Sequence, residues 1–168
     1  MNKVVVCINW GTKYGPPYIN RLYQMVKANI TPPFRFVAFT DTRDGVHPDV
    51  DCFDLPAMPG FMPQRTIGQW PKSRLWAAEL GDLTGPFLFV DLDVTITGSM
   101  DAFFEYGDPQ DVVLALNAAK PFQKLGQTSI YRMPVGALAP LQDMFAADPQ
   151  GVADKYRFEQ HFVTKPSS

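Results

Sequence analysis

A short, nearly uncharged run that ends in two aspartates is the feature that most constrains this chain. Phe87–Val90 is wholly apolar, and Asp91 and Asp93 follow within the next three residues. A continuous apolar run is typical of a strand buried on both faces, as in parallel sheets. We expect this strand to extend over Phe87–Val94. Residues two apart on a strand project to the same face, so both carboxylates should point one way at its end.

The first forty residues predict a βαβ unit. Val4–Ile8 is a continuous apolar run typical of a first strand, and a polar loop follows it. Pro16 and Pro17 favour the start of a helix, and apolar residues at spacings of three and four continue to Ile30. Phe34–Thr40 then predicts a second strand. Two parallel strands joined through a helix are the building block of α/β folds.

The rest of the chain predicts further strands and helices around a long ordered loop. With 168 residues, 46% of them apolar and 19% charged, a single globular domain is expected. No stretch of the sequence has the composition of a flexible linker, so we expect no domain boundary. The predicted strands are 51–55, 111–116 and 128–133; the predicted helices are 72–80, 100–106 with Ser99 as N-cap, 137–146 and 152–163; the loop covers 56–71.

Charge and cysteine content exclude several classes of protein. A net charge of −2 offers no general attraction for nucleic acid or for an anionic membrane. Apolar runs such as Val4–Ile8 are too short to cross a bilayer or to form a secretory signal. The two cysteines, Cys7 and Cys52, suggest neither a disulfide framework nor a zinc site. We therefore predict a cytoplasmic protein without a transmembrane segment.

The aspartate pair predicts a metal site. Two carboxylates so close repel each other and are costly to bury unless a cation joins them, and hard oxygen ligands suit Mg²⁺ or Mn²⁺. Ligands of open α/β sheets bind beyond the carboxyl ends of the strands. An Asp-x-Asp pair also arises by chance, as in Asp49–Asp51, and a turn or capping role is the alternative. The apolar run before Asp91 favours the metal.

Other polar residues are expected at the same edge of the sheet. The loop over residues 9–15 offers backbone amides, an amide side chain and aromatic rings, but it matches neither the dinucleotide-binding nor the P-loop glycine pattern. An ordinary strand-to-helix connection is equally consistent with it. Asp41 follows the second strand, although it also fits a turn. Lys72 and Arg74 precede the acidic strand and are able to neutralise phosphate, and the solvated start of a helix is the alternative for both.

These segments together resemble a known enzyme family. Asn9–Tyr23, Phe36–Asp41, Trp70–Lys72 and Phe87–Gly98, in that order, are similar to bacterial glycosyltransferases of the GT-A fold, with family eight as the nearest broad relative. The resemblance spans roughly residues 4–163. It implies an α/β fold with a Rossmann-like, mixed, mostly parallel sheet flanked by helices. It also implies a single domain whose residues 1–98 bind nucleotide and metal and whose residues 99–168 face the acceptor.

The resemblance implies a glycosyltransferase that uses a nucleotide-diphosphate sugar, with a UDP-sugar as the expected donor, and a saccharide or lipid-linked acceptor. Mn²⁺ or Mg²⁺ would be held by Asp91 and Asp93. Glu159 and Gln160 resemble an acidic-Gln pair on the acceptor side, with Glu159 as the candidate base if the reaction inverts. The implied donor-binding residues are Asn9, Gly11, Thr12, Tyr14, Asp41, Lys72, Asp91, Gln127 and Ser129.

The chain departs from the family pattern in two ways. Many relatives supply a further histidine ligand near the C-terminus within a His-x-x-Gly segment, and neither His47 nor His161 has that context. The chain is also short for the family, so the C-terminal part is expected to be short or truncated.

Two alternatives stay open. Asp91 and Asp93 after an apolar strand also fit a haloacid-dehalogenase-like phosphatase, with Asp91 as nucleophile and Asp93 as general acid. The other alternative is a catalytically inactive domain that binds a nucleotide sugar.

Overall fold

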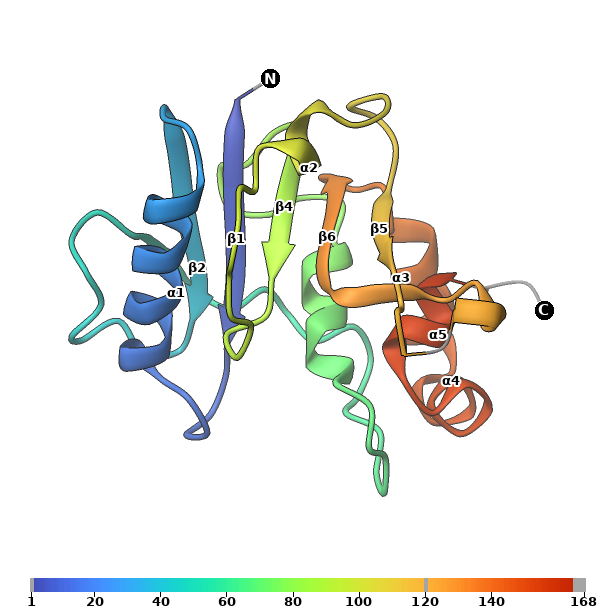
Figure 1. Ribbon diagram of the computed structural model, residues 1–168. Coiled ribbons are helices and arrows are strands. Elements are labelled where there is room, and N and C mark those ends of the chain that lie inside the picture. Colours follow the sequence, from blue (N-terminus) through green and yellow to red (C-terminus); the bar gives the residue numbers. More distant parts are fainter. Residues whose placement is uncertain (1, 120, 165–168) are drawn as a thin grey trace. The chain divides into compact units, whose positions relative to one another are not determined.

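The computed structural model describes residues 2–119 and 121–164. Within these residues the strands form one six-stranded mixed sheet in the order β3-β2-β1-β4-β6-β5 (Figure 1). β1 pairs in parallel with β2 and with β4, and β2 pairs in parallel with β3, whereas β6 pairs with β4 in the antiparallel sense. The predicted α/β class with a mixed, mostly parallel sheet is confirmed.

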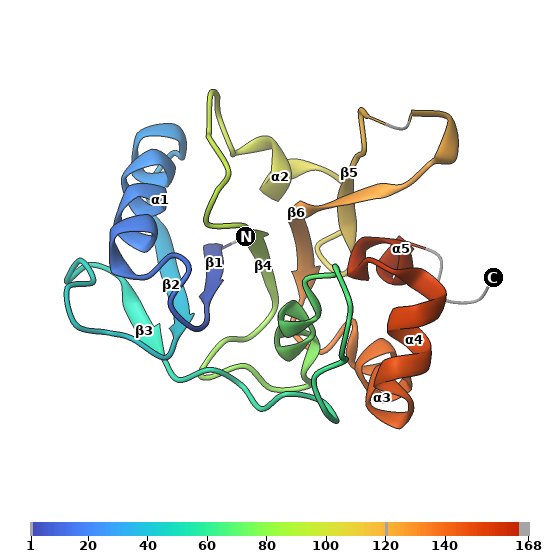
Figure 2. The ribbon, with the colours of Figure 1, turned by 90° about the horizontal axis from the view of Figure 1, so that it is seen from below.

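The chain begins with the predicted βαβ unit. β1 spans Lys3–Asn9, α1 spans Pro16–Asn29 and β2 spans Phe34–Thr40. α1 starts at the first of two prolines, where a missing N–H costs nothing, and Gly15 before it has a φ of 79°. The register pairs Asn9 with Thr40, so both strands end at the same level. The edge strand β3 covers only Asp51–Phe53 (Figure 2).

One face of β1, β2 and β4 packs against α1. The stripe of α1 that the sequence predicts faces the sheet, and Ile19, Leu22 and Val26 are fully buried. They belong to one apolar cluster with alternate residues of the strands and with two residues of segment 100–104: Val5, Cys7, Phe36, Ala38, Leu88, Val90, Met100 and Phe104. The core below the carboxyl ends of these strands is therefore rigid.

The predicted strand over 87–94 is too long. β4 covers Pro86–Val90, and Asp91 and Asp93 lie in the turn that follows it. The amide of Val94 donates to the carbonyl of Asp91 over 3.3 Å, and Leu92 is buried between the two aspartates. Strand alternation therefore does not orient the carboxylates, because the backbone turns as soon as the apolar run ends.

Several helix predictions need correction. The segment predicted as a helix over 72–80 is the 3₁₀ helix η1, Trp70–Trp76, and the backbone is extended at Ala77. α2 covers only Ala102–Glu105, and Asp101, not Ser99, is at its N-cap position, without a side-chain capping bond. The hydroxyl of Ser99 accepts the amide of Asp101 over 3.2 Å. The predicted helix over 152–163 is two helices, α4 (Pro149–Tyr156) and α5 (Glu159–Thr164). Arg157 between them adopts a φ of 61°, which ends the first helix.

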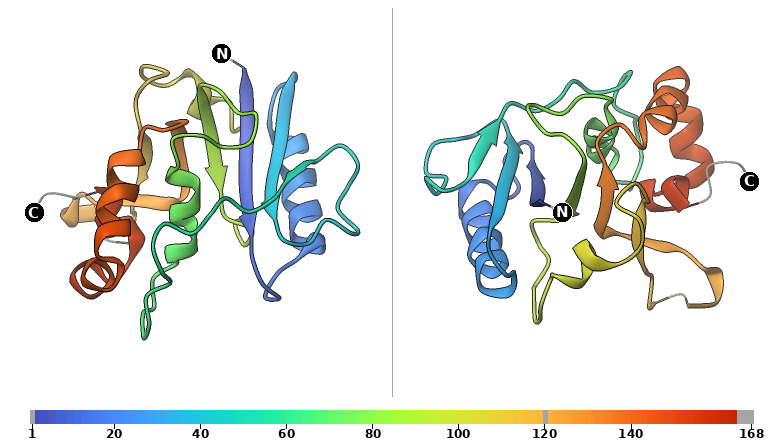
Figure 3. Two further views of the ribbon diagram at one scale, coloured as in Figure 1. Left: turned by 180° about the vertical axis from the view of Figure 1, so that it is seen from behind. Right: turned by 90° about the horizontal axis from the view of Figure 1, so that it is seen from above.

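The other elements agree with prediction within about two residues. β5 covers Val113–Leu116, β6 covers Gly126–Pro134 and α3 covers Ala139–Ala147, with the short 3₁₀ helix η2 at Pro121–Gln123. Residues 54–69 contain no helix or strand. The predicted loop over 56–71 is therefore confirmed up to Gln69, whereas the predicted strand over 51–55 ends at Phe53. Figure 3 shows α3, α4 and α5 as the orange to red helices. Residues 165–168, the predicted end of a short C-terminal part, lie outside the described residues.

The chain divides into two compact units. Unit 1 consists of residues 1–55, 85–113 and 129–134, and unit 2 of residues 56–84, 114–128 and 135–168. The core of unit 2 is aromatic: Trp70 stacks on Phe145 with ring centroids 5.1 Å apart, and Trp76 and Phe162 complete the cluster. In the part of the chain that the structure describes, no helix has the length and apolar character needed to cross a membrane.

Candidate functional site

The carboxyl ends of three neighbouring strands of unit 1 carry the predicted polar residues. β1, β2 and β4 run parallel, so their carboxyl ends meet at one edge of the sheet. The loop over 10–15 follows β1, Asp41 follows β2, and Asp91 and Asp93 follow β4. The topology therefore places the loop and all three aspartates at the edge where ligands of open α/β sheets bind.

Asn9 is the buried anchor of this edge. The residue is only 1% exposed, and both polar atoms of its side chain form hydrogen bonds within the protein. Nδ2 donates to Oγ1 of Thr40 over 3.1 Å, and Oδ1 accepts the amide of Gly15 over 2.9 Å. These bonds join β1 to β2 and fix the far end of the loop, so Asn9 shapes the loop from below. Gly11 and Thr12 are exposed at its tip.

Asp41 fastens the near end of the same loop. The amide of Gly11 donates to Oδ2 of Asp41 over 2.7 Å, and Gly11 has a φ of 64°, a conformation that favours glycine. The hydroxyl of Thr42 donates to Oδ1 over 3.3 Å. Asp41 lies in a bend directly after β2, at the predicted edge of the sheet, and its carboxylate holds the loop there.

Tyr14 connects the loop to the acidic turn. Its hydroxyl donates to Oδ2 of Asp93 over 2.8 Å, and its ring lies 4.8 Å from that of Tyr18. The Lys13 ammonium lies 4.6 Å from the centre of the Tyr14 ring. Hydrogen bonding to Tyr14, with the charge of Asp93 as a smaller contribution, raises the pKa of Lys13. The Lys13 ammonium therefore lies over the same ring whose hydroxyl bonds Asp93.

Asp91 differs from Asp93 in its surroundings. It is half-buried, whereas Asp93 is exposed, and its amide donates to the carbonyl of Ser129 in β6 over 2.8 Å. This bond extends the pairing of β4 and β6 by one residue and fixes the backbone from which the Asp91 side chain leaves. Ser129, a predicted donor-binding residue, is half-buried and contributes this main-chain acceptor.

The acidic turn suits a magnesium or manganese ion in its chemistry. Among the described residues no group of three or more His, Cys, Asp or Glu side chains is placed to hold a metal ion. Mg²⁺ commonly binds through one or two carboxylates together with waters and substrate phosphates, and Mn²⁺ prefers the same oxygen ligands. Asp91 and Asp93 supply that number of carboxylates, so the residues present fit such an ion.

The remaining predicted residues lie in unit 2. Lys72 of η1 is 5% exposed and forms an ion pair with Glu159 of α5, with Nζ 3.5 Å from Oε1. The other oxygen of Glu159 accepts the amide of Gln69 over 2.9 Å. Thr128 of β6 donates to Glu159 over 3.4 Å, and its carbonyl accepts from Lys72 over 3.5 Å. Both charges are thus buried within a shared network.

Gln127 and Gln160 are half-buried neighbours of that network, one residue before Thr128 and one after Glu159. Sequence reasoning missed Thr128, and it missed Thr40, the partner of Asn9. Thr40 ends a mostly apolar strand, where a buried hydroxyl needs a partner, and that was the available signal. Thr128 stands between Gln127 and Ser129 and leaves no such signal. The two histidines lie beside aromatic rings. The ring centroids are 4.8 Å apart for His47 and Tyr23, and 5.7 Å apart for His161 and Phe158.

Comparison with solved structures identifies the fold. The galactosyltransferase LgtC in complex with donor and acceptor sugar analogs matches with a TM-score of 0.61 and 13% identity, over 92% of this chain and 65% of that one. The chain has the GT-A glycosyltransferase fold. An active-site mutant of LgtC gives the same score and identity over 86% of this chain and 65% of that one. The similarity to LgtC is consistent with the resemblance to family eight.

A second glycosyltransferase supports the same fold. The apo form of GlyE from Streptococcus pneumoniae TIGR4 matches with a TM-score of 0.54 and 10% identity, over 92% of this chain and 39% of that one. The GT-A chain therefore spans 65% of the length of LgtC and 39% of that of GlyE. No protein-family model matches the sequence, and no curated protein does.

Proposed function

We propose that this chain is a glycosyltransferase domain that moves a sugar from a nucleotide-diphosphate donor to a saccharide or lipid-linked acceptor. The observation that carries the proposal is the single edge of unit 1 that combines the loop after β1, Asp41 after β2, and Asp91 and Asp93 after β4. The GT-A fold supports it, since LgtC and GlyE are glycosyltransferases. A UDP-sugar is the proposed donor.

The loop and Asp41 would bind the nucleoside. Asn9 is buried and acts through the loop, because both of its polar atoms are bonded to the protein. Gly11, Thr12 and Tyr14 offer exposed or half-exposed backbone, hydroxyl and ring surface. Asp41, which is exposed, adds a carboxylate beside Gly11. The planar base would stack on the ring of Tyr14, and the ribose hydroxyls would donate to the carboxylate of Asp41.

The acidic turn would hold the diphosphate end of the donor. Asp91 and Asp93 would bind Mn²⁺ or Mg²⁺, which when bound neutralises negative charge on the diphosphate. In the reaction, the bond from the sugar carbon to the diphosphate oxygen breaks and takes its electron pair to the diphosphate. A bond forms from the acceptor oxygen to that carbon, and the acceptor proton passes to a base, for which Glu159 is the proposed residue if the reaction inverts, or otherwise to the departing diphosphate. Asp91, with its amide bonded to Ser129, keeps the metal-binding turn in place.

The remaining predicted residues keep the roles that the family resemblance implies. We assign Lys72 to the diphosphate, Gln127 and Ser129 to the donor sugar, and Glu159 and Gln160 to the acceptor side. The proposed location is the cytoplasm, a reducing compartment in which thiols such as Cys7 and Cys52 stay unpaired.

Release of nucleoside diphosphate tests the proposal directly. UDP-sugars and GDP-sugars are incubated with the protein and Mn²⁺, with and without sugar acceptors, and the free nucleoside diphosphate is measured. We expect turnover that needs Mn²⁺ and falls at least about a hundredfold in Asp91→Ala and in Asp93→Ala, because the transition-state charge is no longer neutralised. Asp49→Ala is the matched control, since Asp49 belongs to the other Asp-x-Asp pair.

Equal turnover in Asp91→Ala, Asp93→Ala and the unchanged protein would refute the proposal. A second candidate, a binding domain without turnover, is favoured by one observation. Glu159, the carboxylate proposed as base, is 6% exposed and paired with Lys72. Mn²⁺-dependent binding of a nucleotide sugar without release of the diphosphate would select this second candidate.

A further inference from the structure

Tyr14 is the one aromatic residue of the loop with a hydrogen bond to the acidic turn among the residues described. Its hydroxyl donates to Oδ2 of Asp93 over 2.8 Å. The two residues are 79 positions apart in the sequence, in the loop after β1 and the turn after β4. An exposed carboxylate at the end of a turn has several rotamers, so a bond from a fixed partner decides which one it adopts.

The partner is indeed fixed. The loop is fastened at both ends, by Gly11 to Asp41 over 2.7 Å and by Gly15 to Asn9 over 2.9 Å. Tyr14 lies between these two points, and its ring packs against Tyr18 of α1 at 4.8 Å. The hydroxyl therefore approaches Asp93 from a direction that the loop and α1 together determine.

We propose that Tyr14 is a positioning residue for the metal site: its hydroxyl orients the Asp93 carboxylate so that the remaining oxygen binds the divalent ion. This inference rests on the proposed function, because it takes Asp93 as a metal ligand. A carboxylate has two oxygens and about four lone-pair sites, so a bond at Oδ2 leaves Oδ1 available. Hydrogen bonds from outside the coordination shell fix the orientation of ligands, and their loss costs about 10–100-fold in metal affinity.

The same bond would link the nucleoside loop to the metal. When two binding sites are linked, the first ligand changes the affinity for the second by the same factor as the second changes the affinity for the first. Tyr14 belongs to the loop proposed for the nucleoside, and through Asp93 it acts on the proposed metal site. Occupation of the loop would therefore favour the carboxylate orientation that binds the ion.

Titration of Mn²⁺ followed by electron paramagnetic resonance, in the presence of saturating UDP, tests this role. Tyr14→Phe removes only the hydroxyl, and we expect the Kd for Mn²⁺ to rise about tenfold or more. Tyr18→Phe is the matched control: it makes the same change on the adjacent ring, and in the described part of the chain no hydrogen bond joins Tyr18 to Asp93. Its Kd should equal that of the unchanged protein.

Two further measurements separate the outcomes. Melting temperatures without Mn²⁺ should be alike for both variants, which shows that Tyr14→Phe acts on the ion and not on folding. Asp91→Asn tests the metal site itself. If Asp91→Asn weakens Mn²⁺ binding and Tyr14→Phe binds Mn²⁺ as tightly as the unchanged protein or more tightly, the role of Tyr14 is overturned and the proposed function stands. If Asp91→Asn leaves binding unchanged, the proposed metal site fails.

Discussion

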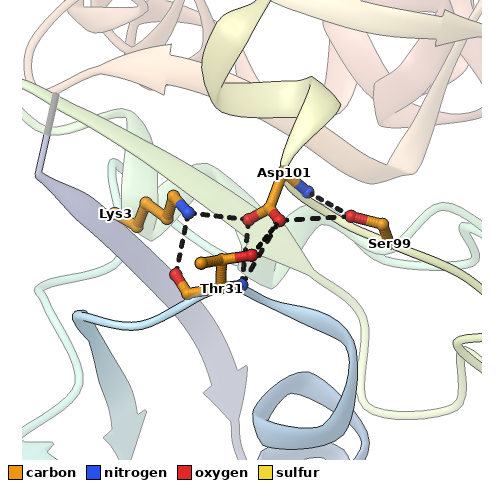
Figure 4. Close-up of polar contacts among 4 residues, drawn as sticks. All are labelled: Lys3, Thr31, Ser99 and Asp101. Carbon is orange, nitrogen blue, oxygen red and sulfur yellow. Dashed lines mark hydrogen bonds and ion pairs between the residues drawn. The ribbon is translucent and has the colours of Figure 1, made fainter.

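At the scale of single residues, Asp101 shows how a surface carboxylate holds separate segments together. Its carboxylate accepts hydrogen bonds from Nζ of Lys3 over 2.7 Å, from the amide of Thr31 over 3.0 Å and from the hydroxyl of Thr31 over 2.7 Å (Figure 4). Ser99 donates to it over 3.3 Å. The start of β1, the segment after α1 and the start of α2 thus meet at one side chain. The hydrogen bond from Lys3, followed by those from Thr31, holds the pKa of Asp101 well below its usual range.

The lowered pKa of Asp101 makes its contribution to stability dependent on pH. The contribution is complete above the pKa of the unfolded state, about 3.9, and it is lost as the pH falls below that value towards the folded pKa. Urea unfolding should therefore show Asp101→Asn less stable than the unchanged protein at pH 7. The difference should shrink progressively below about pH 4. A difference that stays constant across this range would contradict the account.

The buried ion pair of Lys72 and Glu159 predicts a large effect of substitution on the free energy of unfolding. Glu159→Gln removes the carboxylate from a buried ammonium, and removal of one partner of a buried pair costs about 3–5 kcal/mol. The single variants Lys72→Met and Glu159→Leu each leave one buried charge without its partner. The double variant leaves none, so its loss of unfolding free energy should be smaller than the sum of the losses in the two single variants. Denaturant unfolding measures all of these values, and strict additivity would count against a buried pair.

At the scale of elements, Gly126 allows β6 to pass close to β5. A Cβ at this position would lie 2.9 Å from the Cβ of Leu114 and 2.7 Å from its Cδ2. Gly126→Ala should therefore destabilise the protein by about 1–3 kcal/mol through overpacking. Gly98→Ala is the control, because no atom lies within 4 Å of its added Cβ, and it should change stability by less than about 0.5 kcal/mol. Equal effects in the two variants would exclude this cause.

The elements also show what the sequence was able to predict. β2 has the predicted bounds, and β1 and α1 are within one residue at each end, because their apolar patterns are long and are bounded by prolines and polar loops. The break between α4 and α5 was missed, since Arg157 at a φ of 61° leaves no mark in the apolar pattern. The 3₁₀ form of η1 was also missed; its Trp70 packs on Phe145, a tertiary contact that the local apolar pattern does not contain.

For the candidate site, topology was easier to predict than side-chain contacts. The loop after β1, Asp41, Asp91 and Asp93 were expected at one sheet edge, and the parallel strands place them there. The sequence did not predict that Tyr14 reaches Asp93, because that contact depends on the path of the loop. Nor did it predict the pairing of Lys72 with Glu159, two residues whose contact depends on how η1 packs against α5.

At the scale of the whole molecule, neither compact unit is one continuous stretch of chain. Unit 1 takes up three separate segments, and so does unit 2. A boundary of this kind depends on tertiary contacts and leaves no linker of distinct composition in the sequence. The division into a nucleotide-binding half over 1–98 and an acceptor half over 99–168 stays a prediction about function.

Thermal unfolding with UDP, with Mn²⁺ and with both together tests the central claim most directly. A ligand that binds only the folded state at 100 times its Kd adds about 2.7 kcal/mol. For a chain of this length, that should raise the Tm by about 5 °C or more. The account predicts this rise with UDP and Mn²⁺ together, and little or none in Asp91→Ala. An unchanged Tm with UDP and Mn²⁺, or an equal rise in Asp91→Ala, would contradict it.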